Sequence, residues 1–180
     1  MTVYETSIGG VLVFEPRVFE DSRGHFFESF NYAAFEEVLG TPVSFVQDNH
    51  SFSRANVLRG LHYQADRPQG KLVRAVRGTI WDVAVDIRPH SPTFGEWVAH
   101  ELSAENRRQL WVPAGLAHGF LVLSETAEVL YKTTDSYSPA GERCIVWNDP
   151  ELAITWPITD EPVISAKDQQ GMPFRESVTT

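Results

Sequence analysis

KLVRAVRG, residues 71–78, runs directly into TIWDVAVDIRP, residues 79–89. Each segment holds a short apolar run, and each run ends at a turn-forming pair, Arg77-Gly78 or Arg88-Pro89. Short runs rich in β-branched and aromatic residues and bounded by glycine or proline are typical of strands. The two segments therefore predict two consecutive strands.

Within residues 80–87 the side chains alternate imperfectly between the two faces of the predicted strand. One face carries Trp81, Val83, Val85 and Ile87. The other face carries Asp82, Ala84 and Asp86. In an open sandwich this second face contacts solvent, whereas in a small barrel it faces the interior.

Strand-like runs recur along the chain, and turn-forming residues separate many of them. Beyond the two segments above, these runs are residues 11–14, 18–19, 25–30, 43–46, 97–102, 120–123 and 129–134. Many short strands with such punctuation are typical of an all-β sandwich or barrel. The sequence contains no internal repeat or linker, so we expect a single domain over residues 1–180, with a short turn at residues 103–108 and a loose or lightly docked tail from about residue 171.

One segment has the features of a helix. Asn31 is a good N-cap residue. Apolar residues follow at helical spacing, at Phe35, Val38 and Leu39. Gly40 and the Thr41-Pro42 pair then predict the end of the helix.

The composition is that of an acidic globular chain. It has 15 Lys and Arg against 24 Asp and Glu, a formal charge of 15 − 24 = −9, and 42% of its 180 residues are hydrophobic. An acidic balance argues against general binding to nucleic acid or to a membrane surface, because both need a basic surface. A small anionic ligand held by a few local cations is compatible with it.

The single cysteine, Cys144, excludes an intrachain disulfide and any cysteine-rich metal site. The first residues, MTVYETSIGG, lack the basic start and apolar core of a secretory signal. No apolar run approaches the roughly 18–20 residues of a membrane span. We therefore expect a soluble cytoplasmic protein.

Two histidine-containing segments stand out, RGLHYQ at residues 59–64 and PAGLAHGF at residues 113–120. The second is similar to the P-x-G-x-x-H motif of the cupins, and the first resembles their other motif in a degenerate form. A metal-binding cupin would carry H-x-H and a nearby glutamate there. In this sequence Tyr63-Gln64 follows His62, and no glutamate occurs between His62 and Gly78. Because a metal needs three or four convergent ligands, we expect no metal and no other cofactor.

Longer stretches carry a more specific resemblance. They are EPRVFEDSRGHFFESF (15–30), FVQDNHS (45–51), NVLRGLHYQ (56–64), QGKLVRAVRG (69–78), VDIRPHSPTFGEW (85–97), QLWVPAGLAHGF (109–120), VLYKTTDSYSP (129–139), WNDPELAITWP (147–157) and ISAKD (164–168). In this order they resemble the dTDP-4-dehydrorhamnose 3,5-epimerase family of dTDP-L-rhamnose biosynthesis. The resemblance covers nearly the whole chain and implies a cupin-type jelly roll, or double-stranded β-helix, with one or two short helices.

The resemblance also implies inversion of C3 and C5 in dTDP-4-dehydro-6-deoxy-D-glucose, which gives dTDP-4-dehydro-L-rhamnose. Both carbons flank the C4 ketone, so removal of either proton leaves an enolate, and inversion needs a base on one face and an acid on the other. By resemblance the catalytic residues are His62 as the base, Asp168 as its carboxylate partner, Tyr131 as the proton donor and Lys71 as the cation near the enolate oxygen. Taken singly, His62 is as readily a hydrogen-bonded strand histidine, and Lys71, Tyr131 and Asp168 are more readily ordinary packed or solvated residues.

The same resemblance assigns substrate binding to a set of charged, polar and aromatic residues. These are Arg23, Phe26, Glu28, Gln47, Asn49, Arg59, His118, Tyr137, Glu142 and Lys167. Arginine suits phosphate because its planar fork makes paired, charge-assisted hydrogen bonds. Tyr137 matches an aromatic residue that stacks on the thymine. The sequence has no glycine-rich phosphate-binding loop.

A homodimer is also implied, in which the N-terminal segment reaches the partner's site. Three alternatives stay open. The first is a relative in an antibiotic-sugar pathway, either an epimerase that acts on one carbon only or a ketoisomerase. The second is a structural cupin, or one that binds sugar nucleotides without turnover. The third is a metal-dependent cupin oxygenase or isomerase.

Overall fold

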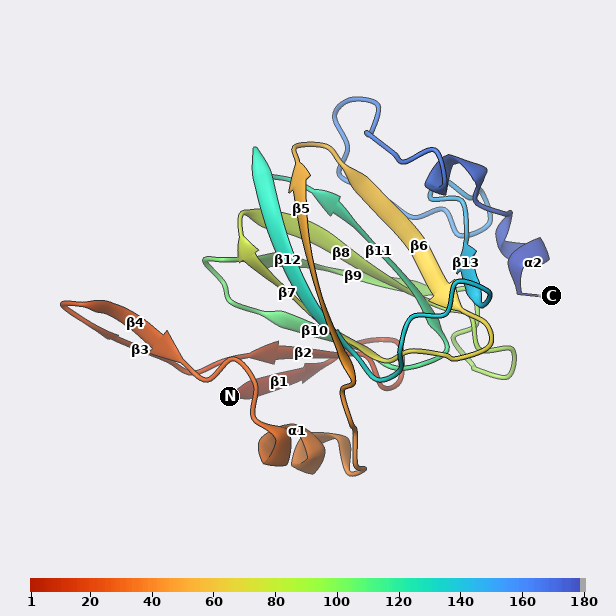
Figure 1. Ribbon diagram of the computed structural model, residues 1–180. Coiled ribbons are helices and arrows are strands. Elements are labelled where there is room, and N and C mark those ends of the chain that lie inside the picture. The colour runs from red at the N-terminus through yellow and green to blue at the C-terminus, as the bar shows by residue number, and fades with distance from the viewer. Residues whose placement is uncertain (179–180) are drawn as a thin grey trace.

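The computed structural model describes residues 1–178 and consists mainly of two antiparallel β-sheets that face each other (Figure 1). The larger sheet has six strands, in the order β1 (Thr2–Glu5), β2 (Leu12–Glu15), β10 (Gln109–Val112), β7 (Lys71–Arg77), β12 (Thr126–Thr133) and β5 (Gln47–Arg54). Segments far apart in sequence therefore pair side by side, as in a jelly roll.

The smaller sheet has five strands, in the order β13 (Glu142–Cys144), β6 (Leu58–Gln64), β11 (Leu116–Val122), β8 (Thr79–Asp86) and β9 (Trp97–Ser103). The chain passes from the larger sheet to the smaller one at Gly78, between β7 and β8. Gly78 has φ +69°, and an added Cβ would lie 2.0 Å from Thr126 O. Only glycine fits this crossing, because both the backbone angle and the close approach exclude a side chain.

Apolar side chains from the inner faces of both sheets form the main core. Its buried members include Val73, Ala75, Ile80, Ala84, Leu102, Leu110, Leu116, Val122 and Val129. The prediction of an all-β fold with facing sheets is confirmed.

A second core covers the outer face of the smaller sheet. Val83 and Val85 of β8 belong to it, together with Leu152, Trp156 and Phe174 from the C-terminal segment. Neither face of β8 is therefore exposed to solvent. Asp82 and Asp86 point to the interior, and both are 0% exposed.

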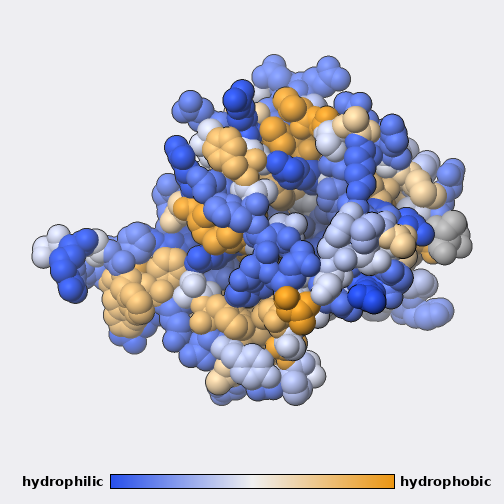
Figure 2. All heavy atoms as spheres, in the orientation of Figure 1, coloured by the Kyte–Doolittle hydropathy of each residue, from blue (hydrophilic) through white to orange (hydrophobic). Residues whose placement is uncertain are grey.

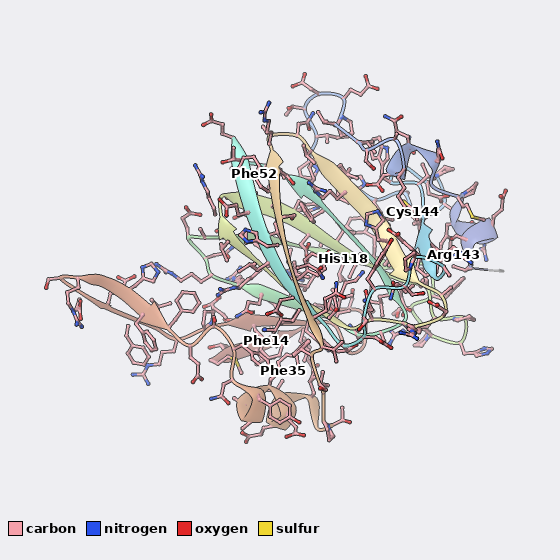
Figure 3. All side chains as sticks on the ribbon, viewed as in Figure 1. Phe14, Phe35, Phe52, His118, Arg143 and Cys144 are labelled. Atoms are coloured by element: carbon pink, nitrogen blue, oxygen red, sulfur yellow. The ribbon has the colours of Figure 1, made fainter. Side chains whose placement is uncertain are left out.

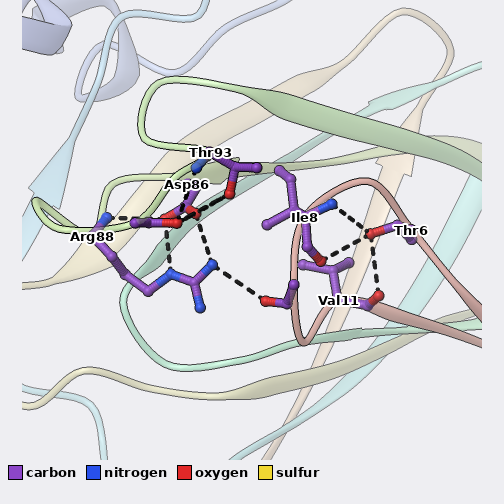
Figure 4. Close-up of polar contacts among 8 residues, drawn as sticks. Thr6, Ile8, Val11, Asp86, Arg88 and Thr93 are labelled. Carbon is purple, nitrogen blue, oxygen red and sulfur yellow. Dashed lines mark hydrogen bonds and ion pairs between the residues drawn. The ribbon is translucent and has the colours of Figure 1, made fainter.

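Asp86 ends β8 and anchors the loop that leads to β9 (Figure 4). Its carboxylate accepts hydrogen bonds from Arg88 Nε at 2.8 Å, Ser91 Oγ at 2.5 Å and Thr93 Oγ1 at 2.6 Å. Arg88 Nη2 also donates to Gly9 O at 3.2 Å. This bond ties the loop to the turn between β1 and β2.

Helix α1 (Tyr32–Leu39) has the ends that the sequence predicts. The Asn31 side chain accepts a hydrogen bond from a first-turn amide at 3.1 Å. Gly40, with φ +66°, donates its N–H to a last-turn carbonyl at 2.9 Å. The turn expected after β9 is also present, where Arg107 N–H donates to Ser103 O at 2.9 Å.

The strand predicted for residues 43–46 is absent. Val43 and Phe45 instead pack against the cluster around Phe35 and Trp111, as the chain leads from α1 to β5. The strand begins only at Gln47. Its sequence, QDNHSFSR, is mostly polar because β5 is an edge strand with a single neighbour, β12, so the apolar pattern misplaced it.

The tail is not loose within the described residues, which corrects that prediction. Phe174, in helix α2 (Phe174–Ser177), is 1% exposed, and its N–H donates to Asp149 Oδ2 at 2.9 Å. The Tyr63 hydroxyl donates to Ser177 O. Residues 179–180 of the predicted tail lie outside the described residues.

No helix within residues 1–178 has the length and apolar character needed to cross a membrane.

A two-stranded hairpin, β3 (Val18–Asp21) with β4 (Gly24–Phe27), projects away from both sheets (Figure 1). Phe19 and Phe26 on this hairpin are 51% and 69% exposed. Figure 2 shows hydrophobic side chains gathered on the hairpin. An isolated hairpin is marginally stable in water, and this one also presents apolar surface to solvent.

Candidate active site

Two histidines lie opposite each other on neighbouring strands of the smaller sheet. His62 of β6 is paired with His118 of β11. The two strands approach closely at Gly60, which has φ +102°, and an added Cβ there would lie 2.6 Å from His118 O. Both histidine side chains point to the same face because they are cross-strand partners.

The histidines line a cavity of about 360 Å³ between the two sheets. Figure 3 shows His118 within the space that the sheets enclose. The lining residues are Gln47, Asn49, Ser51, Arg59, His62, Tyr63, Gln64, Gln69, Lys71, His118, Gly119, Phe120, Tyr131, Tyr137 and Glu142. Nine of the fourteen residues that the resemblance implies are in this set.

Asp168 holds one ring nitrogen of His62. Asp168 begins the short helix η1 (Asp168–Gln170) and is 4% exposed, and its Oδ1 lies 2.7 Å from His62 Nε2. Its Oδ2 accepts the Gly60 N–H at 3.2 Å. Burial alone would raise the pKa of Asp168, but the hydrogen bond and charge of His62 and the Gly60 amide outweigh burial and lower it. The carboxylate stays ionised and leaves Nδ1 as the ring nitrogen that is able to accept a proton.

His118 has a carboxylate partner of its own. Its Nε2 lies 2.8 Å from Oδ1 of Asp82, a fully buried residue of β8. The other oxygen, Oδ2, is buried and has no hydrogen-bond partner among the described residues. The site therefore contains a second histidine–aspartate pair beside the first.

Lys71 brings a buried cation to the same cavity. It is 7% exposed, and its Nζ donates to His62 O at 3.1 Å. Burial lowers the pKa of Lys71 to about 8, while the charges of Asp82 and Glu142 oppose that shift. The ammonium group is therefore charged at neutral pH but sits close to its titration range.

Tyr131 reaches the cavity from β12 in the larger sheet, opposite the strands that carry the histidines. Burial raises the pKa of its hydroxyl, and the charges of Arg59 and Glu142 act in opposite directions on it. The phenol therefore keeps its proton at neutral pH. A proton donor and a proton acceptor thus come from facing sheets.

Polar groups surround the mouth of the cavity. Arg59 Nε donates to Ser53 Oγ at 3.0 Å. Glu142 Oε2 accepts hydrogen bonds from both the Tyr137 hydroxyl and Lys167 Nζ. Burial would raise the pKa of Glu142, but the hydrogen bonds from Lys167 and Tyr137 outweigh burial and lower it. Lys167 joins the site through Glu142 and does not line the cavity.

Three of the implied binding residues lie away from this cavity. Arg23, at the tip of the hairpin, forms an ion pair with Asp21 at 2.5 Å, and Phe26 is exposed. Glu28 Oε1 accepts from Asn31 Nδ2 at 3.1 Å, in a separate cavity of about 230 Å³ beside α1. Within one chain the three residues do not reach His62, and their binding role stays a prediction.

Sequence reasoning missed several residues that the structure places here, chiefly Asp82, Gln64 and Cys144. Gln64 lies two positions after His62, and strand alternation alone puts both on one face. Strand alternation places Asp82 on the face opposite Val83, but nothing in the sequence links it to His118. His62, Cys144 and Asp168 form the one group of three possible metal donors found within residues 1–178, with donor atoms all within 4.8 Å of one another.

Comparisons with known proteins agree on one family. A family model described as dTDP-4-dehydrorhamnose 3,5-epimerase matches residues 5–176. A protein of that name from Pseudomonas aeruginosa is 63% identical over 177 residues, covering 98% of each chain.

Two solved structures are also similar to this chain. An epimerase from Legionella pneumophila, solved in complex with dTDP-4-keto-L-rhamnose, superposes with a TM-score of 0.95 at 49% identity, covering 97% of this chain and 93% of that one. A 3'-monoepimerase from Streptomyces bikiniensis, in complex with dTDP-quinovose, superposes with a TM-score of 0.90 at 35% identity, covering 94% and 86%. The jelly-roll fold expected from the sequence is thereby confirmed.

Proposed function

The chain belongs to the dTDP-4-dehydrorhamnose 3,5-epimerase family, and from that premise we propose that it inverts C3 and C5 of dTDP-4-dehydro-6-deoxy-D-glucose. The product is dTDP-4-dehydro-L-rhamnose, an intermediate of dTDP-L-rhamnose biosynthesis. One observation carries the proposal. A histidine fixed by a buried carboxylate and a protonated tyrosine face one cavity from opposite sheets.

His62 acts as the base in this reaction. Asp168 accepts Nε2–H, so the lone pair on Nδ1 removes the proton from C3 or C5, and the electron pair moves onto the C4 oxygen as an enolate. The imidazolium that forms is stabilised by the Asp168 carboxylate. Lys71 offsets the negative charge on the oxygen.

Tyr131 completes the inversion. Its hydroxyl donates a proton to the face of the carbon opposite His62, and the electron pair of the enolate returns to form the new C–H bond. The tyrosinate and imidazolium then exchange protons with solvent, which resets both groups. Because one base and one acid serve each carbon in turn, the two inversions are successive.

Local cations hold the diphosphate, although the chain as a whole is acidic. Arg59 lines the cavity, and Lys167 stands at its mouth. His118, held by Asp82, offers a further polar contact. The amides of Gln47 and Asn49 and the ring of Tyr137 bind the nucleotide.

The remaining binding groups come from a second subunit in a homodimer. The hairpin carrying Arg23 and Phe26 extends beyond its own sheets with apolar surface exposed, so it has both the reach and the character of a segment that docks on a partner. We also place the enzyme in the cytoplasm, which accords with a chain that has a single cysteine.

A single-carbon epimerase is the second candidate, favoured by the likeness to a 3'-monoepimerase at 35% identity. NMR of the substrate with the enzyme in D₂O separates the two. Inversion with deuterium at both C3 and C5 supports the double epimerase, and inversion at one carbon supports the alternative. An unlabelled, unchanged substrate would contradict both and favour a binding protein.

A further inference from the structure

Cys144 is a close neighbour of the His62–Asp168 pair that the reaction does not use. It lies on β13, directly across from His62 of β6. Its Sγ donates to Asp168 Oδ1 at 3.9 Å, and the same oxygen lies 2.7 Å from His62 Nε2. Two polar hydrogens, one on sulfur and one on nitrogen, therefore converge on one carboxylate oxygen.

We propose that His62 Nε2, Cys144 Sγ and Asp168 Oδ1 form an inhibitory binding site for a thiophilic divalent cation such as Zn²⁺. The expected inhibition rests on the proposed function, whereas the binding of the cation does not.

The spacing of the donor atoms is close to that of a tetrahedral zinc site. Zinc bonds of about 2.0–2.3 Å to nitrogen, oxygen and sulfur place tetrahedral ligands roughly 3.3–3.7 Å apart. The three donor atoms already lie within 4.8 Å of one another. The His62–Asp168 contact must open by less than about 1 Å, and the thiol must move inward by a similar amount. A water molecule would supply the fourth ligand.

The donor types select the cation. A thiolate with an imidazole and a carboxylate suits zinc and its transition-metal neighbours, whereas Mg²⁺ and Ca²⁺ prefer oxygen ligands alone. Burial and, after it, the negative charges of the nearby Asp168 and Glu142 carboxylates raise the pKa of the Cys144 thiol. The same negative charges favour a bound cation.

The proton balance explains why a bound cation would inhibit. Coordination releases the thiol proton of Cys144 to solvent and forms the metal–sulfur bond. The metal also takes the lone pair of His62 Nε2, so the single proton of the neutral imidazole moves to Nδ1. Nδ1 then has no lone pair for the substrate, and Asp168 no longer orients the ring. The base is held in its inactive tautomer.

Cys144 allows a matched test, because it is the one donor outside the catalytic machinery. Enzyme treated with a chelator and freed of it, as wild type, Cys144→Ser and Cys144→Ala, is titrated with Co²⁺, and the thiolate-to-cobalt absorption band is recorded. The rate of solvent deuterium exchange into the substrate is then measured against Zn²⁺, with Mg²⁺ as the control cation.

We expect the cobalt band in the wild type only, and reversal of zinc inhibition by chelator. Loss of a mere supporting contact lowers metal affinity about 10–100-fold, so loss of the thiolate should weaken inhibition at least about tenfold in both variants. A wild type without the band overturns the site, and so does equal zinc sensitivity in all three proteins. A metal-free wild type without epimerase activity would overturn the proposed function instead, while the cobalt titration would still report on the site.

Discussion

The charge of Lys71 depends strongly on its surroundings, and this makes its role testable through pH. Burial places its pKa at about 8, so the ammonium is charged below that pH and loses its charge as pH rises through it. We expect the rate of enolate formation to fall over that window. The pH dependence of deuterium incorporation, measured at saturating substrate, checks this.

Lys71→Met supplies the comparison for that pH profile. Removal of one oxyanion-stabilising donor typically costs about 10²–10³-fold in rate. We expect the variant to be slower by this factor and to lose the decline near pH 8, because no titrating ammonium remains. If the variant shows the same fall in rate above about pH 8 as the wild type, that fall is due to the titration of another group.

His62 and Tyr131 should separate two events that the wild type couples. In Tyr131→Phe, His62 still removes a proton, exchanges it with solvent and returns deuterium to the original face, so label enters while inversion becomes slow. The phenyl ring preserves the contacts of Tyr131 with its neighbours. NMR in D₂O scores label and stereochemistry separately at C3 and C5.

The companion variant for this experiment is His62→Ala, in which neither exchange nor inversion is expected. Persistent exchange there would remove His62 from the role of base. Unimpaired inversion in Tyr131→Phe would likewise remove Tyr131 from the role of acid.

Among the elements, the loop between β8 and β9 depends on one buried carboxylate. Burial alone would raise the pKa of Asp86, but the hydrogen bonds from Arg88, Ser91 and Thr93 outweigh burial and hold it well below its ordinary value. Because the folded-state pKa is lowered, the stabilisation is present above the ordinary carboxyl pKa of about 3.9 and is lost as pH falls below it.

Asp86→Asn should remove this stabilisation without changing the shape of the side chain. We expect a loss of about 2–3 kcal/mol in the free energy of unfolding at pH 7, since charge-assisted hydrogen bonds are lost while Arg88 remains partly solvated. The wild type should also lose more stability than the variant between pH 6 and pH 3. Urea unfolding followed by fluorescence measures both quantities, and parallel pH profiles would contradict the assignment.

The same strands show how far sequence predicts elements. Residues 80–87 alternate apolar and polar side chains, and both faces are buried as a barrel-like interior requires. The sequence did not predict strand β5, because an edge strand that lines a polar cavity needs little apolar pattern. Residues 43–46 are apolar for a different reason, which is their contact with the cluster around Phe35. The local pattern of apolar residues therefore predicts which side chains are buried, but it does not predict which strands pair.

For the molecule as a whole, the local sequence pattern predicts only part of the site, because residues far apart in the chain meet there. His62 and Asp168 are 106 positions apart, and nothing between them indicates that a docked C-terminal segment will join them. Resemblance to a family supplied that pairing, and the structure places the two side chains in contact. The resemblance assigns no role to Cys144 or Asp82, so only the structure shows that they lie beside the two histidines.

The proposed homodimer, with the hairpin of one subunit at the cavity of the other, predicts complementation between two defective subunits. Arg23→Ala impairs the hairpin and Lys71→Ala impairs the cavity, and each homodimer should be poorly active. In a mixed dimer, the intact hairpin of the Lys71→Ala subunit completes the intact cavity of the Arg23→Ala subunit. Random exchange makes about half of the dimers mixed, with one good site each, so about one quarter of wild-type activity should return.

Co-unfolding and refolding an equimolar mixture, followed by the exchange assay, measures this return. The two variants refolded separately and combined afterwards at low concentration are the control. If mixing restores no activity although mixed dimers form, the hairpin does not serve the neighbouring site.

The docking of Asp168 onto β6 also sets an order of events during translation. Both sheets are complete once β13 has left the ribosome, but His62 still lacks the carboxylate that selects its tautomer. At elongation speeds of roughly 5–20 residues per second, His62 precedes Asp168 by about 5–20 s. A chain with both sheets formed thus has the cavity before it has a fixed base, and proteolytic trimming ahead of η1 would remove the Asp168 carboxylate from His62 in the mature enzyme.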